Sequence, residues 1–325
     1  MQDIGARLRD QGFSDKAVDL SLGSWRPATQ KSYNVYLARW KKFAVEHSIS
    51  DISPSIPNVC NFLAFLFEEG IGHSAINSAR SALSVFCKSV DGYQVGKHPN
   101  VCRLVKGVFE QRPSLPRYVQ TWDVGGVLQS LSETNLAKDL SLKELTLKLS
   151  LLLSLVTGQR GHALHLLKVR DVRCTESRCV LVFSDKHKTT RPGFHTAPIV
   201  LETFENPKLC VVKHIIQYLY LTKDKRTDEE FFISIQKPHA AVARSTFSRW
   251  IKLALSNAGV DMSKYGPHST RAASTSAASM GGTSINEILK SASWASGGTF
   301  QRFYLRDVEE KSISFSQSIL SSGSH

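Results

Sequence analysis

Two short motifs late in this sequence carry side chains suited to phosphate chemistry. Pro267-His-Ser-Thr-Arg271 places a histidine and an arginine three residues apart, and this spacing puts both on one face at the start of a helix. Trp294 and Tyr304 follow, and Thr157-Gly-Gln-Arg160 adds a second arginine upstream. Two arginines, a histidine, an indole N–H and a phenol suggest one activity, which is attack on a phosphodiester without a metal ion.

The elements that must position these groups are predicted to be helical. Ser141-Leu-Lys-Glu144 is a capping-box pattern, so it predicts an apolar helix that runs to Thr157 and stops at Gly158. Arg160 then lies on a tight connection, where it either contacts a substrate or only caps helix carbonyls. Thr299 is a candidate N-cap for the helical piece that carries Tyr304.

The whole chain reads as a mainly α protein of two domains. Its 325 residues, 42% of them hydrophobic, are enough for two cores. Residues 1–23 are polar and predicted to be loosely ordered, and residues 24–112 have the periodicity of a helical bundle. Two prolines keep the stretch 113–120 extended, which predicts a linker there. Residues 121–325 are predicted to form an α+β domain, in which strands near 179–183 and 194–201 make a small antiparallel sheet.

The composition of the chain indicates which kind of partner it binds. The formal net charge of +13 favours a polyanion, and no apolar run reaches transmembrane length. The N-terminus has no signal-peptide core, and the six cysteines show no metal-ligand spacing, so we expect reduced thiols in an intracellular protein. Because no nucleotide-binding loop motif is present either, we expect neither a cofactor nor a metal.

Several basic side chains are candidate phosphate contacts, and an ordinary solvated surface is the alternative for each of them. The turn from Asp185 to Gly193 holds two lysines, which either reach a groove, donate a proton to a leaving alkoxide, or remain in solvent. The DNA-binding candidates are Lys31, Lys41, Lys42, Lys106, Lys186, Arg244 and Arg249.

In this order the motifs resemble the catalytic domain of tyrosine recombinases, the phage-integrase-type enzymes. Thr157-Gly-Gln-Arg160 is similar to the family's T-G-x-R box and His268-Ser-Thr-Arg271 to its H-x-x-R box, while Trp294 stands at the second His/Trp position and Tyr304 at the nucleophile. The likeness spans about residues 121–306, and the first domain resembles the family's core-binding domain. Trp-Asp-Val after the linker, with Ser-Trp-Ala-Ser and Thr-Phe-x-x-Phe-Tyr near the end, most resembles recombinases of DIRS/Ngaro-type retrotransposons.

The resemblance implies a site-specific recombinase or integrase that cleaves and rejoins double-stranded DNA through a 3′-phosphotyrosyl intermediate. It further implies mobile-element integration, a nuclear location, a dimer on each site and a tetramer in the synapse. The implied catalytic residues are Arg160, Lys188, His268, Arg271, Trp294 and Tyr304, with Lys186 as the alternative lysine.

Two departures from the family pattern keep other functions open. Many members have a carboxylate three residues after the first arginine, where this chain has Ala163. The gap from Trp294 to Tyr304 is one residue longer than the commonest spacing, which would put Phe303 in register. The alternatives are a DNA-binding protein without catalysis, a type IB topoisomerase, which uses a similar catalytic set, and a helical scaffold whose basic charge is incidental.

Overall fold

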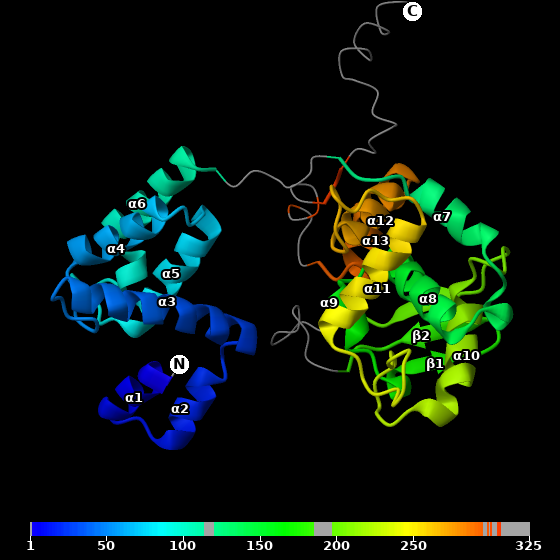
Figure 1. Cartoon of the computed structure of the whole chain (residues 1–325), viewed down its shortest axis with the longest axis horizontal. Helices are drawn as coiled ribbons and strands as arrows, with labels where there is room; N and C mark the ends of the chain where they lie inside the picture. Colours follow the sequence, from blue (N-terminus) through cyan, green and yellow to red (C-terminus); the bar gives the residue numbers. More distant parts are fainter. Residues whose placement is uncertain are drawn as a thin grey trace, which may run out of the picture. The chain divides into compact units, whose positions relative to one another are not determined.

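The computed structural model describes residues 2–113, 120–184, 197–294, 298, 300 and 304–306 (Figure 1). The chain divides into two compact units, Met1–Pro116 and Arg117–His325. The division falls inside the stretch 113–120 that the sequence predicts as a linker, of which residues 114–119 lie outside the described part.

The first unit is a bundle of α-helices around an aromatic core. Three of its helices, α3, α4 and α6, carry a proline in the first turn, where its missing N–H costs no hydrogen bond. Trp40 and Phe62 are fully buried and meet edge to face, with ring centroids 5.2 Å apart. The helices are α1 (Gln2–Asp10), α2 (Asp15–Leu22), α3 (Pro27–Glu46), α4 (Ile56–Glu68), α5 (His73–Phe86) and α6 (Pro99–Gln111), with the 3-10 turn η1 (Val95–Lys97).

The N-terminal segment differs from the sequence-based expectation. Residues 1–23 were expected to be loosely ordered, but α1 and α2 occupy most of this range. Ile4 and Val18 are buried, and the Arg7 guanidinium donates hydrogen bonds to the carbonyls of Val85 and Phe86 at the end of α5. These contacts to a distant helix have no signature in the local sequence.

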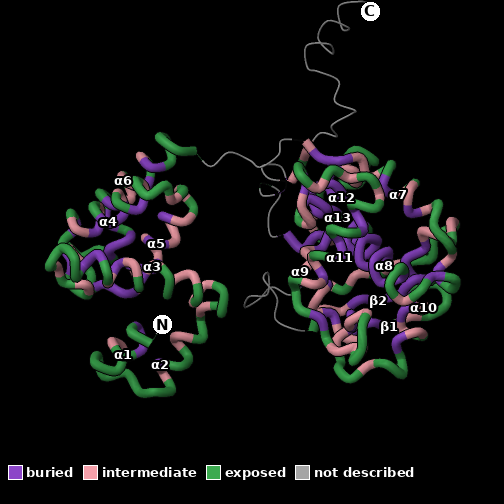
Figure 2. Tube along the Cα trace, viewed as in Figure 1, coloured by how far each residue is buried: buried purple, intermediate pink, exposed green. Residues whose placement is uncertain are grey.

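In the second unit the helices surround α8. Twelve of the sixteen residues of α8 are buried, and the helix packs against α10, α11 and α12. Figure 2 shows α8 mainly in the colour of buried residues. None of the helices in the described residues combines the length and the apolar composition needed to cross a bilayer. The helices are α7 (Val124–Glu133), α8 (Leu142–Thr157), α9 (Gly161–His165), α10 (Val211–Thr222), α11 (Arg244–Asn257), α12 (Ser269–Met280) and α13 (Ile285–Ser291), with 3-10 turns η2 (Ala137–Asp139), η3 (Val169–Asp171) and η4 (Lys223–Lys225).

A small antiparallel sheet completes the second unit. Its strands β1 (Val172–Cys174), β2 (Arg178–Leu181) and β3 (Ile199–Glu202) lie in the order β1-β2-β3, and the register pairs Leu181 with both Val172 and Ile199. The small antiparallel sheet predicted from the sequence is therefore confirmed, with β1 as an additional strand. Since α10 contacts β2 and β3, the sheet is anchored to the helical core.

One cysteine pair departs from the expectation that all six thiols are reduced. Cys174 and Cys179 are direct partners across β1 and β2, and the structure joins them in a disulfide. The turn between the two strands brings these residues together, which their spacing of five in the sequence did not indicate. The remaining cysteines are free thiols, and burial raises the pKa of Cys87 to about 12.

Candidate active site

A cavity of about 320 Å³ in the second unit brings together four of the predicted catalytic residues: Arg160, His268, Arg271 and Tyr304. They come from separate parts of the chain, and the packing of α8, α9, α11 and α12 makes them neighbours. The full lining is Ser154, Gln159, Arg160, Gly161, His162, Arg244, Ile251, Pro267, His268, Thr270, Arg271 and Tyr304.

Arg160 is positioned by the end of α8. The predicted capping box of Ser141 and Glu144 is present, and Gly158 ends the helix in the left-handed conformation with φ 58°. A Cβ at Gly158 would approach the Thr275 side chain to 3.3 Å, so both the backbone and the packing favour glycine. The chain then turns into α9, and Arg160 is its N-cap residue.

A network of hydrogen bonds ties this turn to the segment after α13. The Gln159 amide donates to the Ser293 hydroxyl at 2.9 Å and to the Ser291 carbonyl at 2.5 Å. In return the Ser291 hydroxyl donates to the Thr157 carbonyl at 3.0 Å. The turn that carries Arg160 and the segment that carries Trp294 therefore form one connected structure.

Arg271 joins the same two segments through its guanidinium. Nη1 donates to the Gly158 carbonyl at 2.9 Å and Nη2 to the Ala292 carbonyl at 2.5 Å. Burial, and then repulsion from Arg160, lowers the pKa of Arg271, while the Tyr304 phenol opposes this shift. Two cations are therefore held close together in a poorly solvated place, an arrangement that an incoming anion would stabilise.

The start of α12 fixes the histidine beside this arginine. His268 immediately precedes the helix. The Ser269 hydroxyl donates to the Gly266 carbonyl at 2.7 Å and accepts a hydrogen bond from the Trp122 indole at 2.9 Å. Thr270 donates to the Pro267 carbonyl at 2.9 Å, so side chains hold the entry to the helix.

Trp294 and Tyr304 pack against the guanidinium of Arg271. Its Cζ lies 4.1 Å from the centre of the Trp294 ring and 5.5 Å from that of the Tyr304 ring, and the two rings are 4.6 Å apart. Trp294 does not line the cavity but contacts two residues that do. Its Nε1 is buried and has no hydrogen-bond partner among the described residues.

The half-buried Tyr304 lines the cavity despite the longer spacing after Trp294. Phe300 packs fully buried against Trp294, with ring centroids 5.5 Å apart, and so anchors this segment. Phe303, the alternative register, and Thr299, the predicted N-cap, lie outside the described residues.

The remaining predicted residues are the two lysines of the basic turn and the other DNA-binding candidates. Lys186 and Lys188 lie in 185–196, outside the described part, between the paired strands β2 and β3. Lys41 forms an ion pair with Asp3 at 2.7 Å, whereas Lys42 lies 3.7 Å from Glu46 on its own helix. Four further DNA-binding candidates are exposed and do not line the cavity that holds Arg160 and Arg271. They are Lys31, Lys42, Lys106 and Arg249.

Sequence reasoning missed the part that two residues play in this cavity. Arg244, predicted only as a general DNA contact, lines the cavity from the first turn of α11. His162 also lines it, next to Arg160 in α9. The spacing of His162 from Arg160 was a usable signal, but the place of Arg244 depends on how α11 packs against α8.

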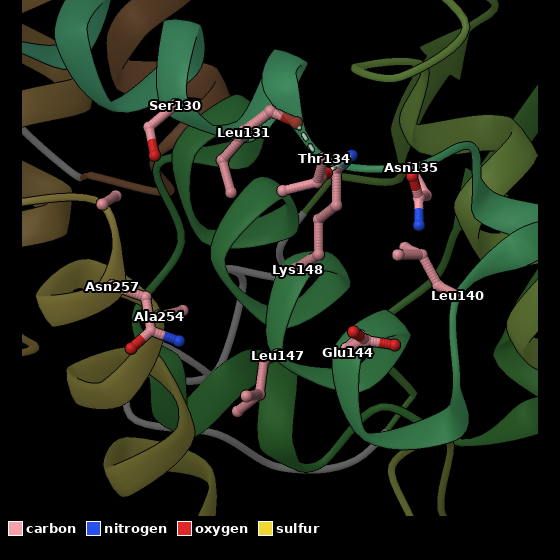
Figure 3. A pocket seen from close by; sticks show the side chains of 11 residues that line it. Ser130, Leu131, Thr134, Asn135, Leu140, Glu144, Leu147, Lys148, Ala254 and Asn257 are labelled. Atoms are coloured by element: carbon pink, nitrogen blue, oxygen red, sulfur yellow. Dashed lines mark hydrogen bonds between the residues drawn. The ribbon is translucent and has the colours of Figure 1, made fainter.

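A second, larger cavity lies toward the other end of α8 and α11 and has different chemistry (Figure 3). Its volume is about 370 Å³, and leucine and alanine side chains make up much of its wall. Its buried cation, Lys148, donates to the Thr134 hydroxyl at 2.6 Å, and burial lowers the pKa of Lys148 to about 8. Of the predicted catalytic residues, Arg160, His268, Arg271 and Tyr304 line the smaller cavity, and none of those that the structure describes lines this one. Among the described residues, no group of three or more histidine, cysteine or acidic side chains is arranged to hold a metal ion.

Comparison with known proteins identifies the fold. No family model and no curated protein sequence matches this chain. Similar solved structures include a lambda integrase dimer bound to a core site, with a TM-score of 0.55 and 14% identity over 97% of this chain and 79% of that one. A lambda integrase tetramer bound to a Holliday junction has a TM-score of 0.51 and 15% identity over 96% and 78%. The Tn1549 transposon integrase, in complex with transposon right-end DNA, has a TM-score of 0.50 and 11% identity over 83% and 85%. The fold is that of the tyrosine recombinases.

Proposed function

We propose that this protein is a site-specific DNA recombinase or integrase that breaks and rejoins strands through a tyrosine. The observation that carries the proposal is the cavity in which two arginines, a histidine and a tyrosine from distant parts of the chain meet. The fold supports the same activity, because the solved structures that share it include integrases bound to DNA.

The arginines have the chemistry to hold the scissile phosphate. Arg160 and Arg271 donate from planar guanidinium groups to its non-bridging oxygens, and they stabilise the charge of the pentavalent transition state. Burial, and then repulsion from Arg160, lowers the pKa of Arg271, and a phosphate in the cavity would relieve the repulsion between the two cations. Trp294 adds an N–H donor once a small movement brings its unpartnered Nε1 to the phosphate.

Tyr304 supplies the nucleophile. Its phenolic oxygen bonds to phosphorus as its proton passes toward His268, and the bond from phosphorus to the 5′-oxygen breaks. Lys188, or Lys186 as the alternative, protonates the departing 5′-oxygen. The 3′-phosphotyrosyl link conserves the energy of the broken bond, so a 5′-hydroxyl of another strand reverses the reaction without ATP.

The partner is double-stranded DNA, in agreement with a net charge of +13. A dimer on one site and a tetramer in the synapse would follow the lambda integrase assemblies that share this fold. The resemblance to DIRS/Ngaro-type recombinases adds a finer proposal, which is integration of a retrotransposon in a nucleus. Cleavage of DNA from the ends of the encoding element, but not of unrelated DNA, would support this role.

The direct test is a suicide DNA substrate whose cleaved strand loses a short fragment and so traps the covalent adduct. The wild-type protein is expected to form an adduct that resists denaturant, and Tyr304→Phe is expected to form none. Tyr220→Phe serves as the matched control, because Tyr220 on α10 is 74% exposed. DNA binding without any adduct from the wild type would contradict the proposal.

One observation favours a second candidate, a DNA-binding protein that has lost catalysis. Ala163 is buried at the position where many recombinases have a carboxylate. The trapping experiment separates the two functions, since this candidate binds DNA and forms no adduct. Relaxation of supercoiled plasmid without recombined product would instead indicate a topoisomerase of type IB.

A further inference from the structure

A buried serine on α12 contacts the backbone on both sides of the candidate nucleophile. The Ser276 hydroxyl donates to the carbonyl of Tyr304 and accepts a hydrogen bond from the amide of Arg306, both at 2.9 Å. Ser276 is completely buried, and 28 residues separate it from Tyr304 in the sequence. A single side chain therefore holds both the carbonyl of Tyr304 and the amide of Arg306 in place.

These bonds are unusual for a serine inside a helix. Such a hydroxyl commonly donates back to a carbonyl three or four residues earlier. The two preceding side chains do this, since Thr275 donates to the Arg271 carbonyl at 2.7 Å and Ser274 to the same oxygen at 3.4 Å. Alanine flanks this stretch on both sides, at 272–273 and 277–278, and alanine is the better helix former. The hydroxyl at 276 therefore contributes a contact outside the helix.

The same helix begins with the phosphate-binding candidates. His268 and Arg271 lie at the start of α12, and Ser276 follows the arginine after about 1.4 helical turns. A rigid helix therefore sets the distance between the cationic site and the backbone of Tyr304. The Tyr304 amide is held independently, by the Phe300 carbonyl at 2.9 Å.

We propose that Ser276 is a positioning residue that holds Tyr304 at the cavity, ready to attack a phosphate bound by the arginines of the same chain. The inference rests on the proposed function, because it assigns a nucleophilic role to Tyr304. Without the hydroxyl, the Tyr304 carbonyl and the Arg306 amide lose this partner, and the phenol samples positions away from the cavity. A misplacement of about 1 Å slows a reaction by roughly 100-fold, so we expect the covalent step to slow by about 10- to 100-fold.

The test compares Ser276→Ala with Ser150→Ala in single-turnover cleavage at saturating DNA. Ser150 is an equally buried helical serine, and its hydroxyl donates only to the Leu147 carbonyl of its own helix, at 2.9 Å. Ser276→Ala is expected to slow adduct formation by 10- to 100-fold while its affinity for DNA stays unchanged. Ser150→Ala is expected to keep the wild-type rate.

A substrate with sulfur in place of the 5′-bridging oxygen separates a defect in the placement of the nucleophile from a defect in the general acid. Sulfur leaves without a proton, so this substrate reports on the nucleophile and the phosphate but not on the general acid. The defect of Ser276→Ala should persist with it, and the two substrates should show the same fold-change. Recovery of the wild-type rate on the sulfur substrate, or a wild-type rate on ordinary DNA, would overturn the proposal.

Hydrogen exchange tests the contact without any activity. The amide of Arg306 should exchange faster in Ser276→Ala than in the wild type, whereas Ser150→Ala should leave it unchanged. Unaltered exchange at Arg306 in Ser276→Ala would refute the positioning role even if the wild-type protein cleaves no DNA. A wild-type protein that forms no adduct, by contrast, would count against the proposed function itself.

Discussion

A comparison of Trp294 with Trp122 tests whether the indole N–H of Trp294, which has no partner among the described residues, serves catalysis. Both residues are buried, at 7% and 5% exposure, but among the described residues only the N–H of Trp122 has a hydrogen-bond partner, the Ser269 hydroxyl. Replacing either residue with phenylalanine removes one N–H and a similar volume. Trp122→Phe loses a hydrogen bond of about 1 kcal/mol, whereas Trp294→Phe relieves an unpaired buried donor that costs about 1–3 kcal/mol.

The free energy of unfolding should therefore fall by about 2–4 kcal/mol more in Trp122→Phe than in Trp294→Phe. Urea denaturation measures this difference directly. If both variants lose the same stability, the Nε1 of Trp294 has a partner in the folded protein and the reasoning fails.

The rate of DNA cleavage should fall in Trp294→Phe, although this variant is expected to be the more stable of the two. A hydrogen bond from Trp294 to a charged phosphate is worth about 1.5–3 kcal/mol, so Trp294→Phe should slow single-turnover cleavage by roughly 10- to 100-fold. Trp294→His, which keeps an N–H donor, should retain more activity than Trp294→Phe. A Phe variant that cleaves at the wild-type rate would remove Trp294 from the proposed mechanism.

Three further predictions follow from the two cavities. Lys148→Met should stabilise the protein by about 2 kcal/mol at pH 7, because the buried lysine, whose pKa falls from 10.5 to about 8, costs about 3 kcal/mol and its hydrogen bond returns about 1. This gain in the free energy of unfolding should shrink as pH rises from 8 to 10.5, because in this range the lysine has lost its proton in the folded protein but not in the unfolded chain. Urea denaturation at several pH values measures the gain, and a gain that is constant with pH would contradict the prediction. A mixture of Tyr304→Phe and Arg160→Ala subunits should form no covalent adduct, because Tyr304 lies at the cavity of its own chain; restored cleavage would show that the tyrosine acts on another subunit. Arg244→Ala should slow adduct formation at saturating DNA by about 10-fold, because it removes one hydrogen bond to a charged group. Arg249→Ala, on the same helix, should lower only the affinity for DNA. Equal rates of adduct formation in the two variants would show that Arg244 takes no part in the reaction.

Local sequence signals predicted the elements that hold the site. The capping box of Ser141 and Glu144 and the glycine stop at Gly158 are both present, because each depends on residues within one helical turn. The helix α13 was not predicted, although Ser284 and Glu287 form the same capping box and offered the same signal. The three-residue strand β1 is too short for a pattern and exists because β2 pairs with it.

The long-range contacts could not be predicted from local patterns. The bond from Arg271 to the Gly158 carbonyl joins residues 113 positions apart, and the Ser276 contact to Tyr304 depends on how the last segment packs on α12. The motifs identified which side chains to expect at the site but not which backbone groups hold them. The same limit applies to α1, whose Ile4 is buried by a tertiary contact that the polar local sequence does not reveal.

The most direct measurement is mass spectrometry of the adduct formed on a suicide substrate in excess chelator. After digestion, a nucleotide should be found on the peptide that contains Tyr304, linked through its 3′-phosphate, and Tyr304→Phe should yield no such peptide. A nucleotide on any other residue, or cleavage that leaves no protein–DNA bond, would contradict the account.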